Sequence, residues 1–129
     1  MNYTPQEINS IVSEIFDQLK FTASQSVRMS WGAHSYMATV YSNMPALCFR
    51  VSGCLHKGWV VICYNEGTDL YDIYYLNTRR TLKDFQTGVC CDVLGPVIDA
   101  KIERPLGISD DKYFKMAIRD SRNKTRVNQ

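Results

Sequence analysis

The spacing of apolar residues along the chain first predicts an amphipathic helix. Apolar side chains at positions 8, 11, 12, 15, 16 and 19 recur at helical spacing. Just before them, Thr4-Pro5-Gln6-Glu7 has the form of a capping box, with Pro5 at the first helical position. We therefore expect a helix from about Pro5 to Lys20, whose apolar stripe needs a partner surface.

The pattern then changes to strand-like segments separated by short turns. We expect strands at residues 27–31, 36–41, 47–55, 59–64 and 70–76. Short connections between neighbouring strands favour an antiparallel meander of about five strands. One face of that sheet would cover the apolar stripe of the first helix, which makes a two-layer α+β domain.

After residue 77 the chain becomes polar and then helical again. Residues 78–86 indicate a loop or a short helical turn, and residues 89–104 a second helix with Pro96 near its start. A third, short helix follows the Ser109 cap and ends at about Asp120. The expected organisation is one α+β domain over residues 1–120 and a disordered basic tail over residues 121–129.

Composition fits this organisation. A chain of 129 residues is the size of one ordinary domain. Hydrophobic residues make up 45% of the chain and charged residues 22%, values that exclude disorder and low-complexity structure as the default.

The cysteines indicate a reducing compartment. The five cysteines are odd in number and two of them are adjacent, so no simple disulfide framework suits them. The first residues lack the basic and apolar regions of a secretory signal. No apolar run approaches the ~20 residues that span a bilayer. We expect a cytoplasmic protein that does not contact a membrane.

Positive charge is concentrated at the C-terminal end. Acidic side chains outnumber basic ones up to residue 111, whereas Asp120 is the only acid after it. The basic residues of the last segment are Lys112, Lys115, Arg119, Arg122, Lys124 and Arg126. They are candidates for contact with a nucleic acid or another partner. A solvated helix face with a frayed end is the alternative.

One short motif carries a resemblance to known proteins. The segment Gly88-Val89-Cys90-Cys91-Asp92-Val93-Leu94, followed by Val97-Ile98, resembles a segment of small uncharacterised phage and mobile-element proteins. In those proteins an N-terminal helix precedes a meander, and a Gly-Val-aromatic-x-Asp-x-Leu segment opens a closing helix. Here Cys90 replaces the aromatic residue. The resemblance implies this fold and a mobile-element origin, and it implies no activity.

Motifs for known chemistry are missing from the sequence. It contains no phosphate-binding loop, dinucleotide glycine pattern, zinc-protease helix or serine-hydrolase elbow. Cys54 and His56 lie near Cys48 and Cys63, but zinc sites usually need paired spacings that are lacking here. We therefore predict no metal and no cofactor.

The adjacent cysteines Cys90 and Cys91 allow a different chemistry. They precede the second expected helix, where unpaired amides lower a thiol pKa, so they could serve a small thiol-dependent enzyme. The alternative is two small core residues, and neither histidine is near them in sequence.

Six tyrosines fall on expected strands, namely Tyr36, Tyr41, Tyr64, Tyr71, Tyr74 and Tyr75. Exposed rings on a sheet can stack on bases or form a protein interface. Tyrosine is also a favoured strand residue whose ring covers the sheet face.

The meander also predicts a basic end of the sheet. Alternating strand directions bring together two turns and the exit of the last strand, which carry His34, His56, Lys57, Arg79 and Arg80. The opposite end receives Asn43, Glu66 and Asp69. Guanidinium groups and imidazoles at one end would suit an anion-binding edge. Solvated polar turns are the alternative.

These observations favour a non-enzymatic interaction module whose partner is an unknown protein, and the resemblance implies an accessory protein of a phage or mobile element. Nucleic-acid binding through the basic C-terminal segment and a tyrosine-rich sheet face is the first alternative. A small thiol-dependent enzyme that uses Cys54 with His56, or Cys90 and Cys91, is the second.

Overall fold

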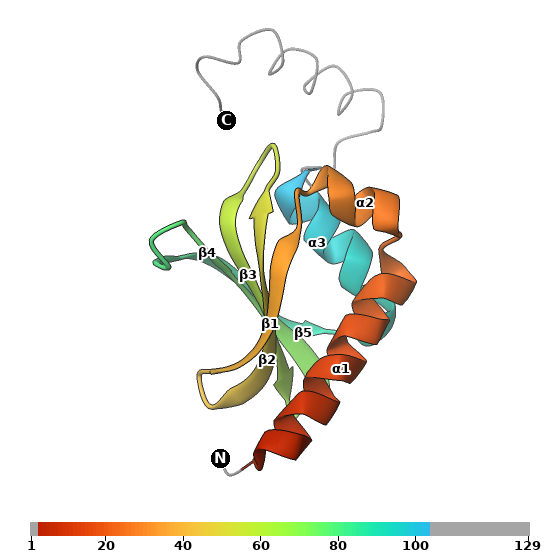
Figure 1. The fold of residues 1–129 in the computed structure, drawn as a ribbon, viewed down its shortest axis with the longest axis vertical. Coiled ribbons are helices and arrows are strands. Elements are labelled where there is room, and N and C mark those ends of the chain that lie inside the picture. Colours follow the sequence, from red (N-terminus) through yellow and green to blue (C-terminus); the bar gives the residue numbers. More distant parts are fainter. Residues whose placement is uncertain (1–2, 104–129) are drawn as a thin grey trace, which may run out of the picture.

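The fold is a five-stranded antiparallel sheet with helices on one side of it (Figure 1). The computed structural model describes residues 3–103. The elements are α1 (Pro5–Thr22), α2 (Gln25–Ser30), β1 (His34–Tyr41), β2 (Met44–Ser52), β3 (Lys57–Asn65), β4 (Leu70–Leu76), β5 (Leu82–Val89), η1 (Cys91–Val93) and α3 (Leu94–Ile102). The strands pair in the order β1-β2-β3-β4-β5, so the sheet is a meander with β1 and β5 at its edges. This confirms the expected α+β class.

Helix α1 begins at the capping box that the sequence predicts. The Thr4 side chain accepts a hydrogen bond from the Glu7 backbone N–H at 3.1 Å, and the Glu7 carboxylate accepts one from the Thr4 backbone N–H at 2.8 Å. These bonds satisfy amides that the first turn leaves unpaired. The apolar stripe of the helix buries Val12, Ile15 and Leu19 against the sheet.

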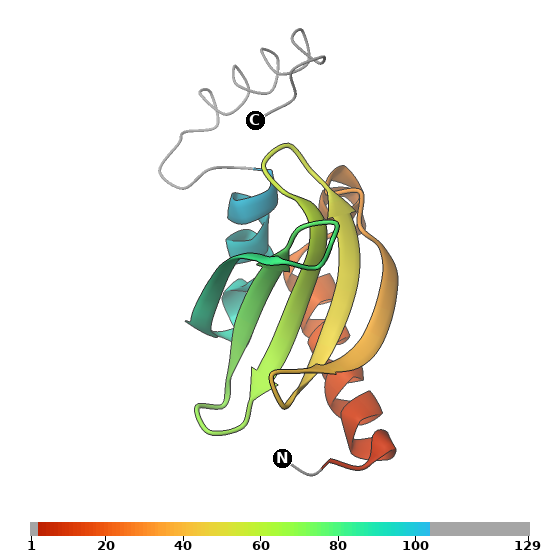
Figure 2. The same cartoon turned by 90° about the vertical axis from the view of Figure 1, so that its left-hand side faces the viewer.

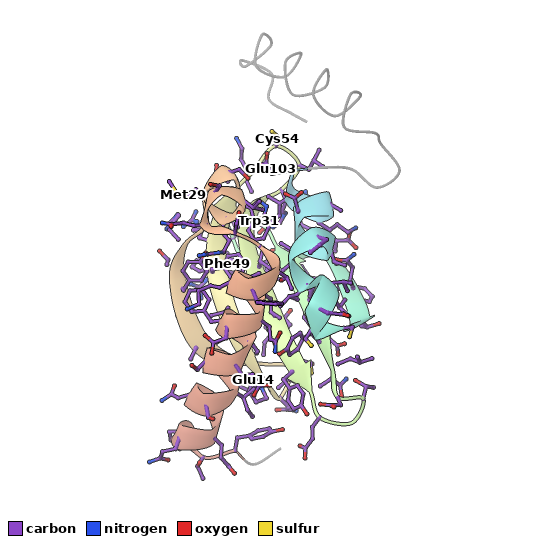
Figure 3. All side chains as sticks on the ribbon, turned by 90° about the vertical axis from the view of Figure 1, so that its right-hand side faces the viewer. Glu14, Met29, Trp31, Phe49, Cys54 and Glu103 are labelled. Carbon is purple, nitrogen blue, oxygen red and sulfur yellow. The ribbon has the colours of Figure 1, made fainter. Side chains whose placement is uncertain are left out.

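The main core lies between the helices and the sheet. Strands β2, β3 and β4 contribute alternate side chains to it, and α3 adds three more; these residues are Leu47, Phe49, Val51, Val60, Ile62, Tyr71, Ile73, Tyr75, Leu94, Ile98 and Ile102. Figure 3 shows Trp31 and Phe49 behind the helices. Trp31, which directly follows α2, donates its Nε1–H to Oδ1 of Asp99 in α3 at 2.9 Å. This hydrogen bond connects the end of α2 to α3.

Residues 27–31 form no strand, contrary to the sequence prediction. Ser24 caps a helix here, because its side chain accepts from the Val27 backbone N–H. The alternation of apolar residues was misleading, because Met29 is 69% exposed while Trp31 is buried. A six-residue helix has too few turns to show a helical period.

Residues 82–89 form a strand, although the sequence predicted a loop or short turn for residues 78–86. Strand β5 pairs with β4 at one edge of the sheet, and most of its side chains are exposed. An edge strand with little burial has no apolar alternation for the sequence to reveal. The sheet therefore has five strands as expected, but it lacks the first expected strand and gains β5.

Helix α3 is shorter than the second expected helix. It spans Leu94–Ile102 and follows the short η1 turn, so it starts five residues later than the sequence prediction. Pro96 lies in its first turn as expected. The predicted third helix, the predicted tail at 121–129 and the domain boundary at residue 120 lie outside the described residues.

Candidate functional site

One face of the sheet carries no helix within residues 3–103. In Figure 1, α1, α2 and α3 lie on the right of the sheet, and the turn between β4 and β5 projects to the left. Figure 2 looks onto this uncovered face, with that turn in front of the strands. We call this surface the open face.

The open face has a small apolar cluster of its own. Alternate residues of β2 and β3 form it, together with Leu76 of β4; these are Met44, Ala46, Trp59, Val61, Cys63 and Leu76. They are buried although no second layer covers them, because long side chains of their neighbours lie over them. Tyr41, Cys48 and Tyr74 pack around the cluster.

Two arginines contact the ring of Trp59 in this cluster. Arg50 pairs with Trp59 across β2 and β3, and its Cζ lies 5.4 Å from the centre of the indole ring. Arg80 comes from the turn between β4 and β5, and its Cζ lies 4.6 Å from the same ring. Both distances are in the cation–π range. No carboxylate within residues 3–103 forms an ion pair with either guanidinium group.

The indole nitrogen of Trp59 has no hydrogen-bond partner within residues 3–103. Trp59 is 7% exposed, and among the described residues its Nε1 is the buried side-chain polar atom that reaches no acceptor. A buried donor without a partner costs about 1–3 kcal/mol. Trp31 provides the contrast, since its Nε1 donates to Asp99.

A groove of about 270 Å³ lies beside Trp59 on the open face. Strand β1 contributes Met37, Thr39, Val40 and Tyr41; β2, β3 and β4 contribute Cys48, Trp59, Val61 and Leu76; and Arg80 comes from the turn. Met37 is 43% exposed, so the groove presents an apolar side chain to solvent. The positive charge of Arg80 lowers the pKa of the Cys48 thiol, but burial raises that pKa more strongly.

The five predicted anion-binding residues lie at one end of the sheet, but they do not converge. His34 begins edge strand β1, His56 and Lys57 lie at the start of β3, and Arg79 and Arg80 lie in the turn after β4. Within the described chain, no hydrogen bond or ring contact links any two of the five. The anion site stays a prediction.

The two histidines have different surroundings. His34 is exposed, and its Nδ1 lies 2.8 Å from Ser35 Oγ. His56 packs edge-on against Tyr75, and its Nε2 donates to the Trp59 carbonyl at 3.2 Å. Burial lowers the pKa of His56, and the charge of Lys83 lowers it further. The backbone carbonyls and Asp84 act in the opposite direction.

The opposite end of the sheet is acidic. The turn between β3 and β4 carries Glu66, which accepts from the Tyr3 hydroxyl, and Asp69, which accepts from the Tyr64 hydroxyl, both at 2.7 Å. The bond to Asp69 is the main reason that the pKa of Tyr64 rises to about 12. The sheet thus has a basic and an acidic end.

The tyrosines are divided between the two faces. Tyr71 and Tyr75 belong to the main core under the helices, and Tyr36 and Tyr64 pack against that core. Only Tyr41 and Tyr74, of the six, pack on the open-face cluster. Phe85 of β5 stacks on Tyr74 with 6.1 Å between ring centres. The six basic residues at 112–126 predicted to contact nucleic acid lie outside the described residues.

Within the described chain, no hydrogen bond joins a thiol to a histidine ring. Cys90 and Cys91 are exposed and line a second groove, of about 440 Å³, between α1 and the acidic end of the sheet. Burial and the neighbours Cys90 and Asp92 raise the pKa of Cys91, which is the opposite of thiolate activation. Cys54 lies beside Glu103, whose Oε1 accepts from the Cys54 backbone N–H at 2.8 Å (Figure 3).

No group of three or more His, Cys, Asp or Glu side chains within residues 3–103 has the geometry to hold a metal ion. The helices of the same region include none that is long and apolar enough to cross a membrane.

The sequence analysis missed the residues at the centre of the open face. Arg50 is a charged residue in an otherwise apolar strand, and Trp59 follows the next turn at the position that pairs with it. Reading the hairpin register from the turn at residues 53–56 would have brought the two together. Comparisons with known proteins add nothing to this site: no protein-family model matches the chain, and no curated protein or solved structure is significantly similar to it.

Proposed function

We propose that this chain is a non-enzymatic binding module and that the open face is its binding surface. The Trp59 site supports this proposal best. There, within residues 3–103, a buried indole N–H reaches no acceptor and two guanidinium groups form no ion pair, beside a groove on a face that carries no helix. Unsatisfied donors next to exposed apolar side chains are typical of a surface that a partner covers.

Site-specific photocrosslinking in extracts of the source cells tests this proposal. A benzophenone amino acid at Met37 reports on the open face, and the same group at Phe21 is the matched control on α1, since Phe21 is 87% exposed. We expect a discrete adduct from position 37 and none from position 21. Equal adducts from both positions, or none from position 37, would contradict the proposal. So would turnover of substrates by the purified protein in a broad hydrolase and transferase screen.

Nucleic-acid binding is the second candidate, and one observation favours it. Phe85 is 54% exposed and stacks on Tyr74, and Tyr74 also contacts Tyr41, so a row of rings crosses the open face. Such rings can stack on bases, and the basic C-terminal segment could contact phosphates. Binding of a labelled oligothymidine would then weaken steeply with salt. An unchanged anisotropy at low salt would remove this candidate.

The remaining proposals concern origin and location. The motif at residues 88–94 spans the end of β5 and η1, and its resemblance supports an accessory role in a phage or mobile element. Cys48, Cys63, Cys90 and Cys91 are free thiols, which supports a cytoplasmic location. A thiol-dependent enzyme has less support, because the pKa of Cys91 is raised.

A further inference from the structure

The polar side chains at the Trp59 site are mostly hydrogen-bond donors. The indole N–H and the two guanidinium groups donate hydrogen bonds and have no acceptor function. The nearest buried carboxylate on the open face, Asp72, already accepts from Asn65 Nδ2 at 3.0 Å and from the Gly88 N–H at 3.1 Å. A ligand of this site must therefore bring its own acceptors, and a negative charge suits it best.

Arg80 lies over the ring that carries the indole nitrogen. Its guanidinium group covers the ring, yet the side chain is exposed and the residue lies in a turn at φ 67°. A carboxylate can bind this guanidinium in two-point geometry, which is stronger than a solvent-exposed cation–π contact. An arriving carboxylate would thus draw Arg80 off the ring and uncover the Trp59 N–H.

The shape of the groove favours a segment of protein. Its volume of about 270 Å³ is below the range of roughly 300–1,000 Å³ typical of small-molecule pockets, and it suits one or two side chains. Four of its residues, Met37, Thr39, Val40 and Tyr41, lie on edge strand β1. An extended segment beside an edge strand presents every second side chain to the same face. Base stacking is less suited to this site, because two guanidinium groups already contact the Trp59 ring.

We infer that the open face binds an extended, acidic segment of a partner protein, which places an apolar side chain in the groove and a carboxylate against Arg80 and Arg50. An acceptor of the same segment reaches Trp59 Nε1. This inference rests on the proposed function and names the ligand class of its surface.

The test uses peptides with defined charge. Acetylated, amidated hexapeptides that alternate leucine with glutamate, glutamine or lysine are titrated into ¹⁵N-labelled full-length protein. The readout is the indole N–H signal of Trp59, assigned by its loss in Trp59→Phe. We expect the glutamate peptide to move this signal while the Trp31 signal stays. The glutamine peptide should bind about tenfold more weakly, since it lacks the charged acceptor, and the lysine peptide should not bind.

An Arg80 variant tests whether this side chain accounts for the preference for the glutamate peptide. Arg80 is exposed, so Arg80→Gln leaves the fold intact. It should lower the affinity for the glutamate peptide about tenfold and leave the affinity for the glutamine peptide unchanged. Lys20→Gln is the matched control, because Lys20 lies 4.6 Å from the Phe16 ring on helix α1 and makes the same kind of contact away from the open face. We expect no change from it.

Three results would overturn the inference: no peptide binding, equal binding of the three peptides, or an Arg80→Gln variant that binds glutamate peptide normally. Binding of oligothymidine at Trp59 in place of the peptides would overturn it in favour of nucleic acid. A crosslink at position 37 combined with any of the first three results would leave the proposed function standing and reject only the acidic ligand. If neither the crosslink nor the peptide selectivity were seen, the proposed function and the acidic ligand would both be rejected.

Discussion

The five cysteines occupy contrasting environments, and these determine which thiols react. Cys63 is buried in the open-face cluster, where burial raises its pKa to about 12. Cys90 and Cys91 are exposed at the start of η1. Because the thiolate is the reactive form, a buried thiol with a high pKa alkylates slowly.

We therefore expect iodoacetamide at pH 8 to label Cys90 and Cys91 well before Cys63, as measured by peptide mass spectrometry. Labelling in denaturant is the control and should remove the difference. Modification of Cys63 at the rate of the exposed pair in the folded protein would mean that the open-face cluster is not closed.

His56 makes the stability of the fold depend on pH. Its pKa is lowered in the folded protein, mainly by burial, so the unfolded chain binds a proton more readily. Stability is therefore complete above the ordinary histidine pKa of about 6.5 and falls as the pH drops below it.

Urea unfolding at pH 7.5 and pH 5.5 measures this effect. The wild-type protein should have the lower free energy of unfolding at pH 5.5, and His56→Gln should reduce the difference between the two values. His34→Gln is the matched control, because that ring is exposed and should leave the difference unchanged. An undiminished difference in His56→Gln would assign the pH dependence to other groups.

Among the elements, α1 and α3 are held together by an unusually close approach. The Gly95 backbone N–H donates to Thr22 Oγ1 at 2.8 Å, and a Cβ at Gly95 would lie 2.3 Å from the Thr22 carbonyl oxygen. No side chain fits there without separating the helices.

Gly95→Ala should therefore lower the free energy of unfolding by about 1–3 kcal/mol, as overpacking of a core does. Gly67→Ala is the matched control, because a Cβ there meets only Asn65 Oδ1 at 3.4 Å. The control should change stability by less than about 1 kcal/mol in either direction. Chemical denaturation measures both, and equal stability of the two variants would contradict the close approach.

The elements also show how far the sequence predicts this fold. Helix α1 and strands β2, β3 and β4 were predicted because each buries a regular set of apolar residues against one layer. Helix α2 was misread as a strand because it is one and a half turns long and buries none of its own residues. Strand β5 was missed because its hydrogen bonds with β4, not buried side chains, hold it in place.

At the scale of the whole molecule, the meander explains why the basic end could be predicted and the site could not. His56 and Arg79 lie two turns apart in the chain, so they share one end of the sheet even though one expected strand was wrong and another was missed. Which face each side chain takes depends on the strand register and on the fold of the turn. Arg80 lies over Trp59 because the turn after β4 projects over the open face (Figure 2), and no pattern in the sequence encodes that.

The two faces of the sheet divide stability from binding, and this division can be measured with one variant on each. Ile62 is fully buried in the main core, whereas Met37 lines the groove and is 43% exposed. Ile62→Val should lower the free energy of unfolding by about 0.5–1.5 kcal/mol, because it removes a buried methyl group. It should leave binding of the leucine–glutamate peptide unchanged.

Met37→Ser should show the reverse behaviour. Stability should stay within about 0.5 kcal/mol of the wild type, since the side chain is already exposed before binding. Peptide affinity should fall several-fold, because the groove loses an apolar contact that is covered only in the complex. Urea denaturation gives the free energy of unfolding of each variant, and peptide titration gives the peptide affinity of each. If Met37→Ser weakened the fold as much as Ile62→Val did and left the peptide affinity unchanged, the open face would be part of the structural core and not a binding surface.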